Sequence, residues 1–156
     1  MPPFTILRAK HLFDGTSAVA LESAAVLIDG ETVRATGHAA EIRQPDGAEV
    51  TIFDYGDATI LPGLVDVHTH MMGIGDGTLG DDLVRDYDDD MLLLRAAQNA
   101  RRALHSGVTT ARENGAKGRV AFSLKEGMRR GLVAGPRMVV SGRPLSAEWI
   151  VDRPVL

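Results

Sequence analysis

The first sixty residues consist of short apolar runs separated by turn residues. The segments FTIL, AAVLIDGETVRATG and AEVTIFDYGDATIL have the length and spacing of strands. Asp29 and Gly30 lie between two of these runs, where a glycine tolerates the positive φ that a tight hairpin turn requires. The pattern therefore predicts a small antiparallel sheet that ends near residue 60.

The character of the chain changes beyond this point. Leu64, Val65 and Val67 follow one another too closely for a strand with one solvent-exposed face, which predicts a strand buried on both faces. We expect a domain boundary here, with residues 1–60 before it and residues 61–156 after it.

Two amphipathic helices alternate with short strands in the second region. Apolar residues recur at three- and four-residue spacing from 92 to 104, after an acidic stretch that suits the positive end of a helix dipole. A second helix is expected over residues 120–130, and short strands over 108–111 and 138–140. Strands separated by helices of this length indicate parallel βαβ units, so the expected fold class is α/β.

Three polar residues alternate at the end of the first strand of this region. Side chains at i, i+2 and i+4 of a strand share one face, so Asp66, His68 and His70 are expected to project to the same side. Neighbours on that face lie about 6.5–7 Å apart, and two imidazoles can tilt toward one cation that takes nitrogen at about 2.0–2.1 Å. The spacing predicts a metal ion shared by His68 and His70. The alternative is that the two histidines bind no metal and are merely exposed or hydrogen-bonded, as is common for a His-x-His pair considered alone.

The surrounding sequence gives this pair a family context. The stretch LPGLVDVHTH at 61–70 resembles the first barrel strand of the amidohydrolase superfamily. The stretch GVTTARENG at 107–115, and GPR at 135–137 with Ser-Gly at 141–142, are similar to the next two strands of its imidazolonepropionase-like and prolidase-like branch. The resemblance implies the first three strands of a metal-dependent hydrolase (β/α)₈ barrel, preceded by part of a small β-sandwich.

The resemblance also implies a reaction and its cofactors. In the family the two histidines of the first strand bind the more buried of two divalent metals, commonly zinc, and a carboxylated lysine bridges the metals; His68 and His70 match these ligands. A metal-bound hydroxide attacks the substrate carbonyl, since coordination lowers the pKa of water from 15.7 toward about 7. The implied activity is hydrolysis of C–N bonds in small amides, cyclic amides or dipeptides. Manganese, iron and cobalt accept the same ligand types as zinc.

Four further residues are candidates for supporting the metal ligands. Asp66 is expected to orient an imidazole, the alternative being a cap on the strand end. Glu113 stands where the family usually has aspartate, beside the site. Arg112 and Arg137 are expected to form ion pairs beneath the site, the alternative being contact with a substrate carboxylate.

The other polar candidates have structural interpretations. A histidine in the last turn of a helix suits the dipole, two more lie in the predicted sheet, and acidic loops are usually only solvated. The residues concerned are His105, His11 and His38, and the loop residues Asp76, Asp81 and Asp82. An electrostatic role for the loop acids toward a cationic substrate is the less favoured alternative.

Composition narrows the classes of function. The chain has 156 residues, a formal net charge of −4 and no cysteine. This charge gives no broad basic surface for nucleic acid or anionic membrane, and the absence of cysteine excludes thiolate ligands and nucleophiles. No apolar run approaches the roughly 20 residues that span a bilayer and the start does not read as a secretory leader, so a cytoplasmic location is expected.

The length of the second region falls short of a barrel, which needs roughly 250 residues. We therefore expect an N-terminal fragment that is inactive alone, and residues 147–156, which depart from the family pattern, suggest a frameshifted, rearranged or truncated reading frame. The alternatives are a non-catalytic remnant, simple metal binding without turnover, and a subunit whose barrel is completed by a second chain. Self-association through the open edge of the sheet is expected of the isolated chain.

Overall fold

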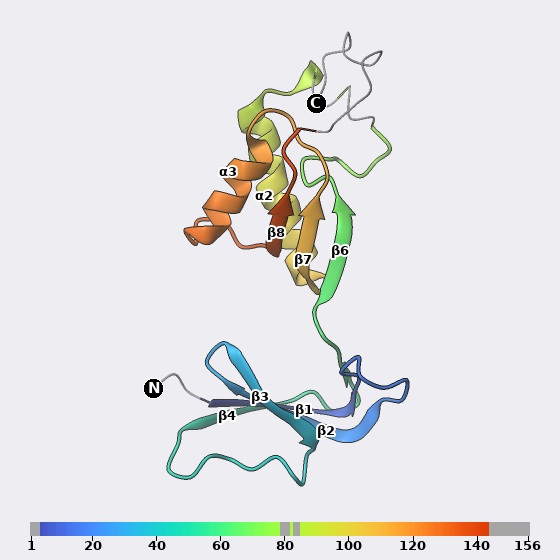
Figure 1. Cartoon of the computed structure of the whole chain (residues 1–156), viewed down its shortest axis with the longest axis vertical. Helices are drawn as coiled ribbons and strands as arrows, with labels where there is room; N and C mark the ends of the chain where they lie inside the picture. The colour runs from blue at the N-terminus through green and yellow to red at the C-terminus, as the bar shows by residue number, and fades with distance from the viewer. Residues whose placement is uncertain (1–3, 79–81, 83–84, 144–156) are drawn as a thin grey trace. The chain divides into compact units, whose positions relative to one another are not determined.

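The chain forms two compact units, Met1–Pro62 and Gly63–Leu156 (Figure 1). The structure is a computed structural model that describes residues 4–78, 82 and 85–143. Asp81 and the divergent segment 147–156 lie outside the described residues. The division between the units falls close to residue 60, where the sequence pattern changes. The assignment of the first unit to a β-sandwich stays a prediction.

The first unit is a five-stranded sheet. Its strands are β1 (Phe4–Leu12), β2 (Leu21–Asp29), β3 (Thr32–His38), β4 (Val50–Asp54) and β5 (Thr59–Ile60). The spatial order is β3-β2-β1-β4, and β5 also pairs with β1. β1 is therefore the central strand. The buried residues Leu12, Ala24 and Val26 form the core of this unit.

The prediction of an antiparallel sheet is right for β1, β2 and β3 and wrong for the last two strands. β1 pairs antiparallel with β2, but parallel with β4 and β5. Gly30, at φ 57°, makes the tight turn between β2 and β3, and such a turn reverses the chain. The connection from β3 to β4 spans residues 39–49, long enough to cross to the other edge of β1 and enter in the same direction.

The second unit has the predicted order of strand, helix, strand, helix, strand. Its elements are β6 (Leu64–Thr69), α2 (Asp89–His105), β7 (Val108–Glu113), α3 (Val120–Arg129) and β8 (Arg137–Val140). The three strands pair in parallel in the order β6-β7-β8. The α/β class and the parallel pairing are therefore confirmed, and closure into a barrel stays a prediction.

Both helices lie on the same side of this sheet (Figure 1). Leu92, Ala96 and Ala100 bury one face of α2, and Leu124 does the same for α3. The helix boundaries follow from local chemistry. The Asp88 carboxylate accepts a hydrogen bond from the Met91 amide at 2.8 Å and caps α2. Gly131, at φ 73°, follows the C-terminus of α3, where a glycine adopts the left-handed conformation without steric cost.

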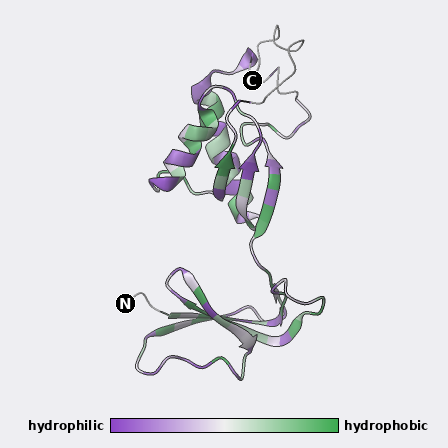
Figure 2. Ribbon diagram, in the orientation of Figure 1, coloured by the Kyte–Doolittle hydropathy of each residue, from purple (hydrophilic) through white to green (hydrophobic). Residues whose placement is uncertain are grey.

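The first strand of this unit is exposed, which corrects the prediction of a buried strand. Leu64, Val65 and Val67 are 54%, 63% and 67% exposed. Figure 2 shows hydrophobic and hydrophilic residues alternating along β6. The physical reason is position. β6 is an outer strand, and within the described residues no element packs beyond it.

Candidate metal centre

The two histidines of the His-x-His motif lie at the carboxyl end of β6. Gly63, just before this strand, packs closely on β7, because a Cβ at that position would lie 2.1 to 2.7 Å from side-chain atoms of Thr109. The Leu64 amide then donates to the Gly107 carbonyl at 2.8 Å. The rings of His68 and His70 are neighbours, with centroids 5.3 Å apart and an interplanar angle of 72°. The extended segment therefore brings both imidazoles together.

His70 has a defined hydrogen-bond partner. Its Nδ1 lies 3.0 Å from the carbonyl oxygen of Gly115, in the loop after β7. A carbonyl only accepts, so this bond requires a proton on Nδ1. In the neutral ring, Nε2 then carries the lone pair that a metal ion takes. The backbone of the neighbouring loop thus selects the tautomer that suits a metal ligand.

Glu113 is the buried carboxylate of the site. It is the last residue of β7 and is 1% exposed. Its Oε2 accepts from the Met71 amide at 2.6 Å, its Oε1 accepts from the Gly115 amide at 3.3 Å, and Oε1 lies 3.4 Å from His70 Nδ1. Burial raises the pKa of the Glu113 carboxyl, and the two amide bonds and His70 oppose that rise.

Asn99 of α2 is a residue that the sequence reasoning missed. Its Nδ2 donates to the carbonyl oxygens of Met71 at 2.8 Å and Gly73 at 2.7 Å. A signal was present in the sequence, because Asn99 follows Ala96 by three positions and so falls on the buried face of the helix. A half-buried amide on an apolar helix face requires partners, and here they are in the loop after His70.

Asp66 and Arg112 form hydrogen bonds that involve backbone groups in the described residues, and the roles expected of them stay predictions. The Asp66 carboxylate accepts from the backbone amide of His68 at 3.1 Å. This contact is local, since an aspartate two residues before an amide reaches it without any tertiary contact. Arg112 is exposed and forms no ion pair with any described residue. Its carbonyl oxygen accepts from Thr69 Oγ1 at 3.1 Å, which links β7 to β6.

The remaining candidate residues form no hydrogen bond or ion pair with the histidine pair in the part of the chain that the structure describes. Asp76 accepts from Thr78 within its own loop, and Asp82 pairs with Arg85 at 2.9 Å. His105 ends α2, as expected, and the two other histidines lie in the sheet of the first unit. None of these interactions joins the candidate centre.

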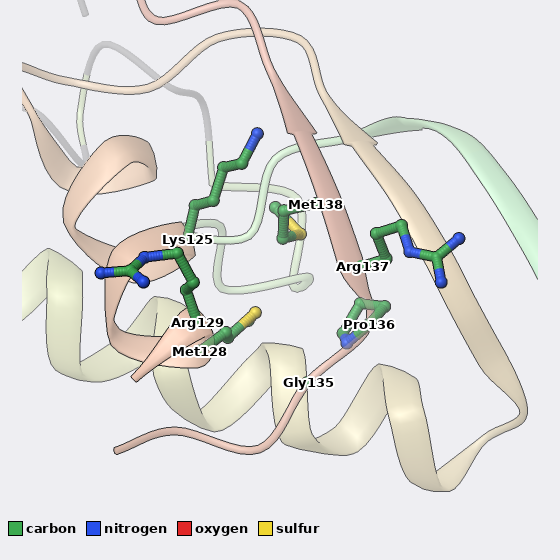
Figure 3. Close-up of a pocket in the computed structure, with 7 residues that line it drawn as sticks. All are labelled: Lys125, Met128, Arg129, Gly135, Pro136, Arg137 and Met138. Carbon is green, nitrogen blue, oxygen red and sulfur yellow. The ribbon is translucent and has the colours of Figure 1, made fainter. Parts of the chain in front are cut away.

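A surface pocket of about 340 Å³ lies at the opposite end of the sheet, at the start of β8 (Figure 3). Met128, Pro136 and Met138 line its apolar part. Figure 3 shows that the charged ends of Arg129 and Arg137 point in different directions, so the cations do not converge on one ligand. Arg137 is exposed, and no described residue forms an ion pair with it. The ion pair expected of Arg137 therefore stays a prediction.

A sequence model of a protein family, described as Amidohydrolase family, matches residues 59–154, more than half of the sequence. The chain belongs to the amidohydrolase family. The resemblance inferred from the strand motifs is thereby confirmed. A search of curated proteins gave no significant match.

Several solved structures are similar to this amidohydrolase chain over most of its length. A structure described as an amidohydrolase is 30% identical with a TM-score of 0.73, and covers 90% of this chain and 32% of its own. An Xaa-Pro dipeptidase with bound methionine in its active site is 26% identical, with a TM-score of 0.74, over 97% of this chain and 37% of its own. A prolidase complexed with N-methylphosphonate-L-proline is 26% identical, with a TM-score of 0.72, over 89% of this chain and 32% of its own. The chain thus spans about a third of the length of these relatives.

Amidohydrolases generally use divalent metals, and the histidine pair fits such an ion in part. Two adjacent imidazoles, one of them with Nε2 available, supply the nitrogen ligands that zinc and similar cations bind. Within the part of the chain that the structure describes, no third His, Cys, Asp or Glu joins them in a cluster. Catalytic zinc usually has three protein ligands, so the pair accounts for part of a coordination sphere.

Among residues 4–78, 82 and 85–143, no helix combines the length and hydrophobicity needed to cross a bilayer.

Proposed function

We propose that this chain contributes the first metal-binding strand of a hydrolase that cleaves C–N bonds in small amides, cyclic amides or dipeptides. The observation that carries the proposal is the histidine pair at the carboxyl end of β6, with His70 Nδ1 bound to a backbone carbonyl. In parallel α/β folds this end of the strands is where catalytic groups gather. Family membership gives the pair its chemical context.

The proposed roles follow from what each residue contacts. His68 and His70 hold the cation through ring nitrogens, and Gly115 keeps the His70 ring in place through its carbonyl. When bound, a divalent cation polarises a carbonyl oxygen and lowers the pKa of water. Glu113 touches the backbone around His70, so its role is support of the ligand. Zinc is the proposed metal, and two ions are proposed for a complete site.

The substrate class rests on similarity to the Xaa-Pro dipeptidase and the prolidase, each 26% identical to this chain. Both structures were solved with an amino acid or a proline derivative bound. A small molecule with a C–N bond next to a carboxylate is therefore the first substrate to test. The remaining metal ligands and the substrate pocket are proposed to come from protein that corresponds to the later two thirds of those relatives.

Metal binding by the histidine pair is tested by equilibrium dialysis against zinc, followed by metal analysis. We expect His68→Ala and His70→Ala each to lower the zinc retained at a given free concentration. His105→Ala is the matched control, because it removes an imidazole at the end of α2 and should leave retention unchanged. Equal zinc content in all four proteins would show that the proposed ligands are wrong.

The hydrolytic part is tested with zinc-loaded protein that contains this sequence and a panel of Xaa-Pro dipeptides, cyclic amides and carboxylic esters. We expect turnover of the C–N substrates, with release of free amine as the readout. His70→Ala should reduce that turnover at least 100-fold if the cation is essential. Turnover confined to esters, or turnover unchanged by His70→Ala, would refute the proposed reaction.

A second candidate is a subunit whose sheet is completed by strands from another chain, including a second copy. It is favoured by the exposure of β6 and by the outer positions of β6 and β8. Unpaired strands with apolar side chains promote association. Light scattering after size exclusion should then show a concentration-dependent mass above that of the monomer, reduced by Val65→Lys. A monomer at every concentration would exclude association between copies.

A further inference from the structure

The turn formed by residues 70–73, directly after β6, is held from two sides. The Gly73 amide donates to the His70 carbonyl at 2.8 Å and closes the turn. Glu113 of β7 accepts the Met71 amide, and Asn99 of α2 donates to the carbonyls of Met71 and Gly73. The peptide groups on both sides of Met71 are therefore fixed by side chains from two different elements.

These contacts are buried or partly buried and mutually supporting. Met71 and Met72 are 6% and 3% exposed and pack in the core between the sheet and the helices. Glu113 also accepts the Gly115 amide, and Gly115 in turn accepts from His70 Nδ1. The same carboxylate thus contacts both loops that surround the His70 ring. A network of hydrogen bonds from two elements to one turn restricts the backbone of that turn.

We propose that Asn99 and Glu113 are positioning residues that hold the 70–73 turn and keep His70 in its Nδ1–H tautomer before any cation arrives. The proposal rests on the function proposed above, in which His70 is a metal ligand. Histidine ligands gain affinity when the other ring nitrogen is hydrogen-bonded, because tautomer and ring orientation are then already correct. Asn99 acts on the ligand from α2, through the backbone alone.

The first test is made on the metal-free chain by nitrogen-15 NMR of the imidazoles. The two nitrogens of a neutral ring give distinct signals, so the tautomer of His70 is read directly, with His70→Ala for assignment. We expect the Nδ1–H form in the natural chain and a mixture of tautomers in Asn99→Ala. Alanine is the best helix former, so this change leaves α2 itself intact.

The matched control is Gln98→Ala. It removes a side-chain amide from the neighbouring position of the same helix, where the residue is exposed. The control should leave both the tautomer and metal binding unchanged. A second variant, Glu113→Gln, keeps the shape of the side chain but turns an amide N–H toward one of the two backbone amides. It should shift the tautomer in the same direction as Asn99→Ala.

The second test is titration with Co²⁺ followed by its visible spectrum, and with Zn²⁺ by competition. Loss of a supporting partner of a metal ligand lowers affinity about 10–100-fold, and Asn99→Ala is expected to fall in this range. Glu113→Gln is included if circular dichroism shows that this variant folds. If it does not fold, the affinity of Asn99→Ala alone tests the positioning role. The Co²⁺ spectrum reports geometry at the ion, which a loss of global stability would not change.

The outcomes separate this inference from the function on which it rests. If Asn99→Ala keeps the Nδ1–H tautomer and the natural affinity while His70→Ala loses the metal, the positioning role is wrong and the metal site stands. If the natural chain binds no metal but Asn99→Ala still changes the tautomer, the positioning role stands and the metal function is wrong. If Gln98→Ala has the same effect as Asn99→Ala, the effect is not specific and the positioning role is refuted.

Discussion

Replacing Gly63 with alanine tests whether close packing at the start of β6 is essential. The added Cβ would lie 2.1 Å from Thr109 Oγ1, 2.3 Å from Cγ2 and 2.7 Å from Cβ. Rotation of the threonine cannot remove the last contact, because its Cβ is fixed by the backbone. Overpacking of this kind costs about 1–3 kcal/mol, and a Gly→Ala change returns about 0.4–1 kcal/mol through the unfolded chain. The free energy of unfolding should therefore fall by up to roughly 2.6 kcal/mol, and by about 1.3 kcal/mol at the middle of both ranges.

The assay is urea denaturation followed by the far-ultraviolet helix signal, which comes from α2 and α3 of the same unit. Gly127→Ala is the matched control, because the nearest atom to its added Cβ is 3.4 Å away and the site is inside α3. It should stabilise the unit by up to about 1 kcal/mol.

A double-mutant cycle with Thr109→Gly then tests the cause. Thr109→Gly removes all three atoms that the new Cβ would meet, so Gly63→Ala should cost less in its presence. If Gly63→Ala is as stable as the control, or if the two changes are additive, the steric explanation is wrong.

Three further changes address the packing and charges of the second unit. Leu92→Ala truncates a side chain that is 0% exposed and leaves a cavity in the core. It should lower the free energy of unfolding by about 2–5 kcal/mol, measured by urea denaturation. Asp88→Ala removes the cap of α2 and should cost about 1 kcal/mol, seen as a lower thermal midpoint. Arg129 and Arg130 hold the pKa of the exposed Glu126 at about 2, below its ordinary value of 4.5. A lowered folded pKa stabilises above about pH 4.5 and loses that contribution as the pH falls toward about 2. The difference in thermal midpoint between the natural chain and Glu126→Gln should shrink over that window, and a constant difference would contradict the assignment.

Local patterns predicted the elements of the second unit well. Apolar spacing located α2 and α3, and both run close to the expected residues because their faces pack on one core. The His-x-His spacing predicted adjacent imidazoles, because alternation is a property of any extended strand. The ligand roles of His68 and His70 stay a prediction.

Features that depend on distant contacts were not accessible from the pattern. The direction of β4 depends on how an eleven-residue connection crosses the sheet, and its sequence contains no marker of that path. Glu113 was placed near the site by resemblance, but its contact with the Met71 amide joins positions 42 residues apart. Asp66 accepts the His68 amide through Oδ1, and its expected role toward an imidazole stays a prediction. Hydrogen bonds between residues as far apart in the sequence as Glu113 and Met71 leave no mark in the local pattern.

The central place of β1 in its sheet has a consequence for biosynthesis. This strand is made early, yet one of its edges stays unpaired until β4 and β5 have left the ribosome. The sheet can therefore close only after about the sixtieth residue has emerged, and until then that edge is open to other nascent chains. Internal initiation or proteolysis beyond Leu12 would remove the partner of three strands at once. Loss of β3, by contrast, would take away a single outer strand.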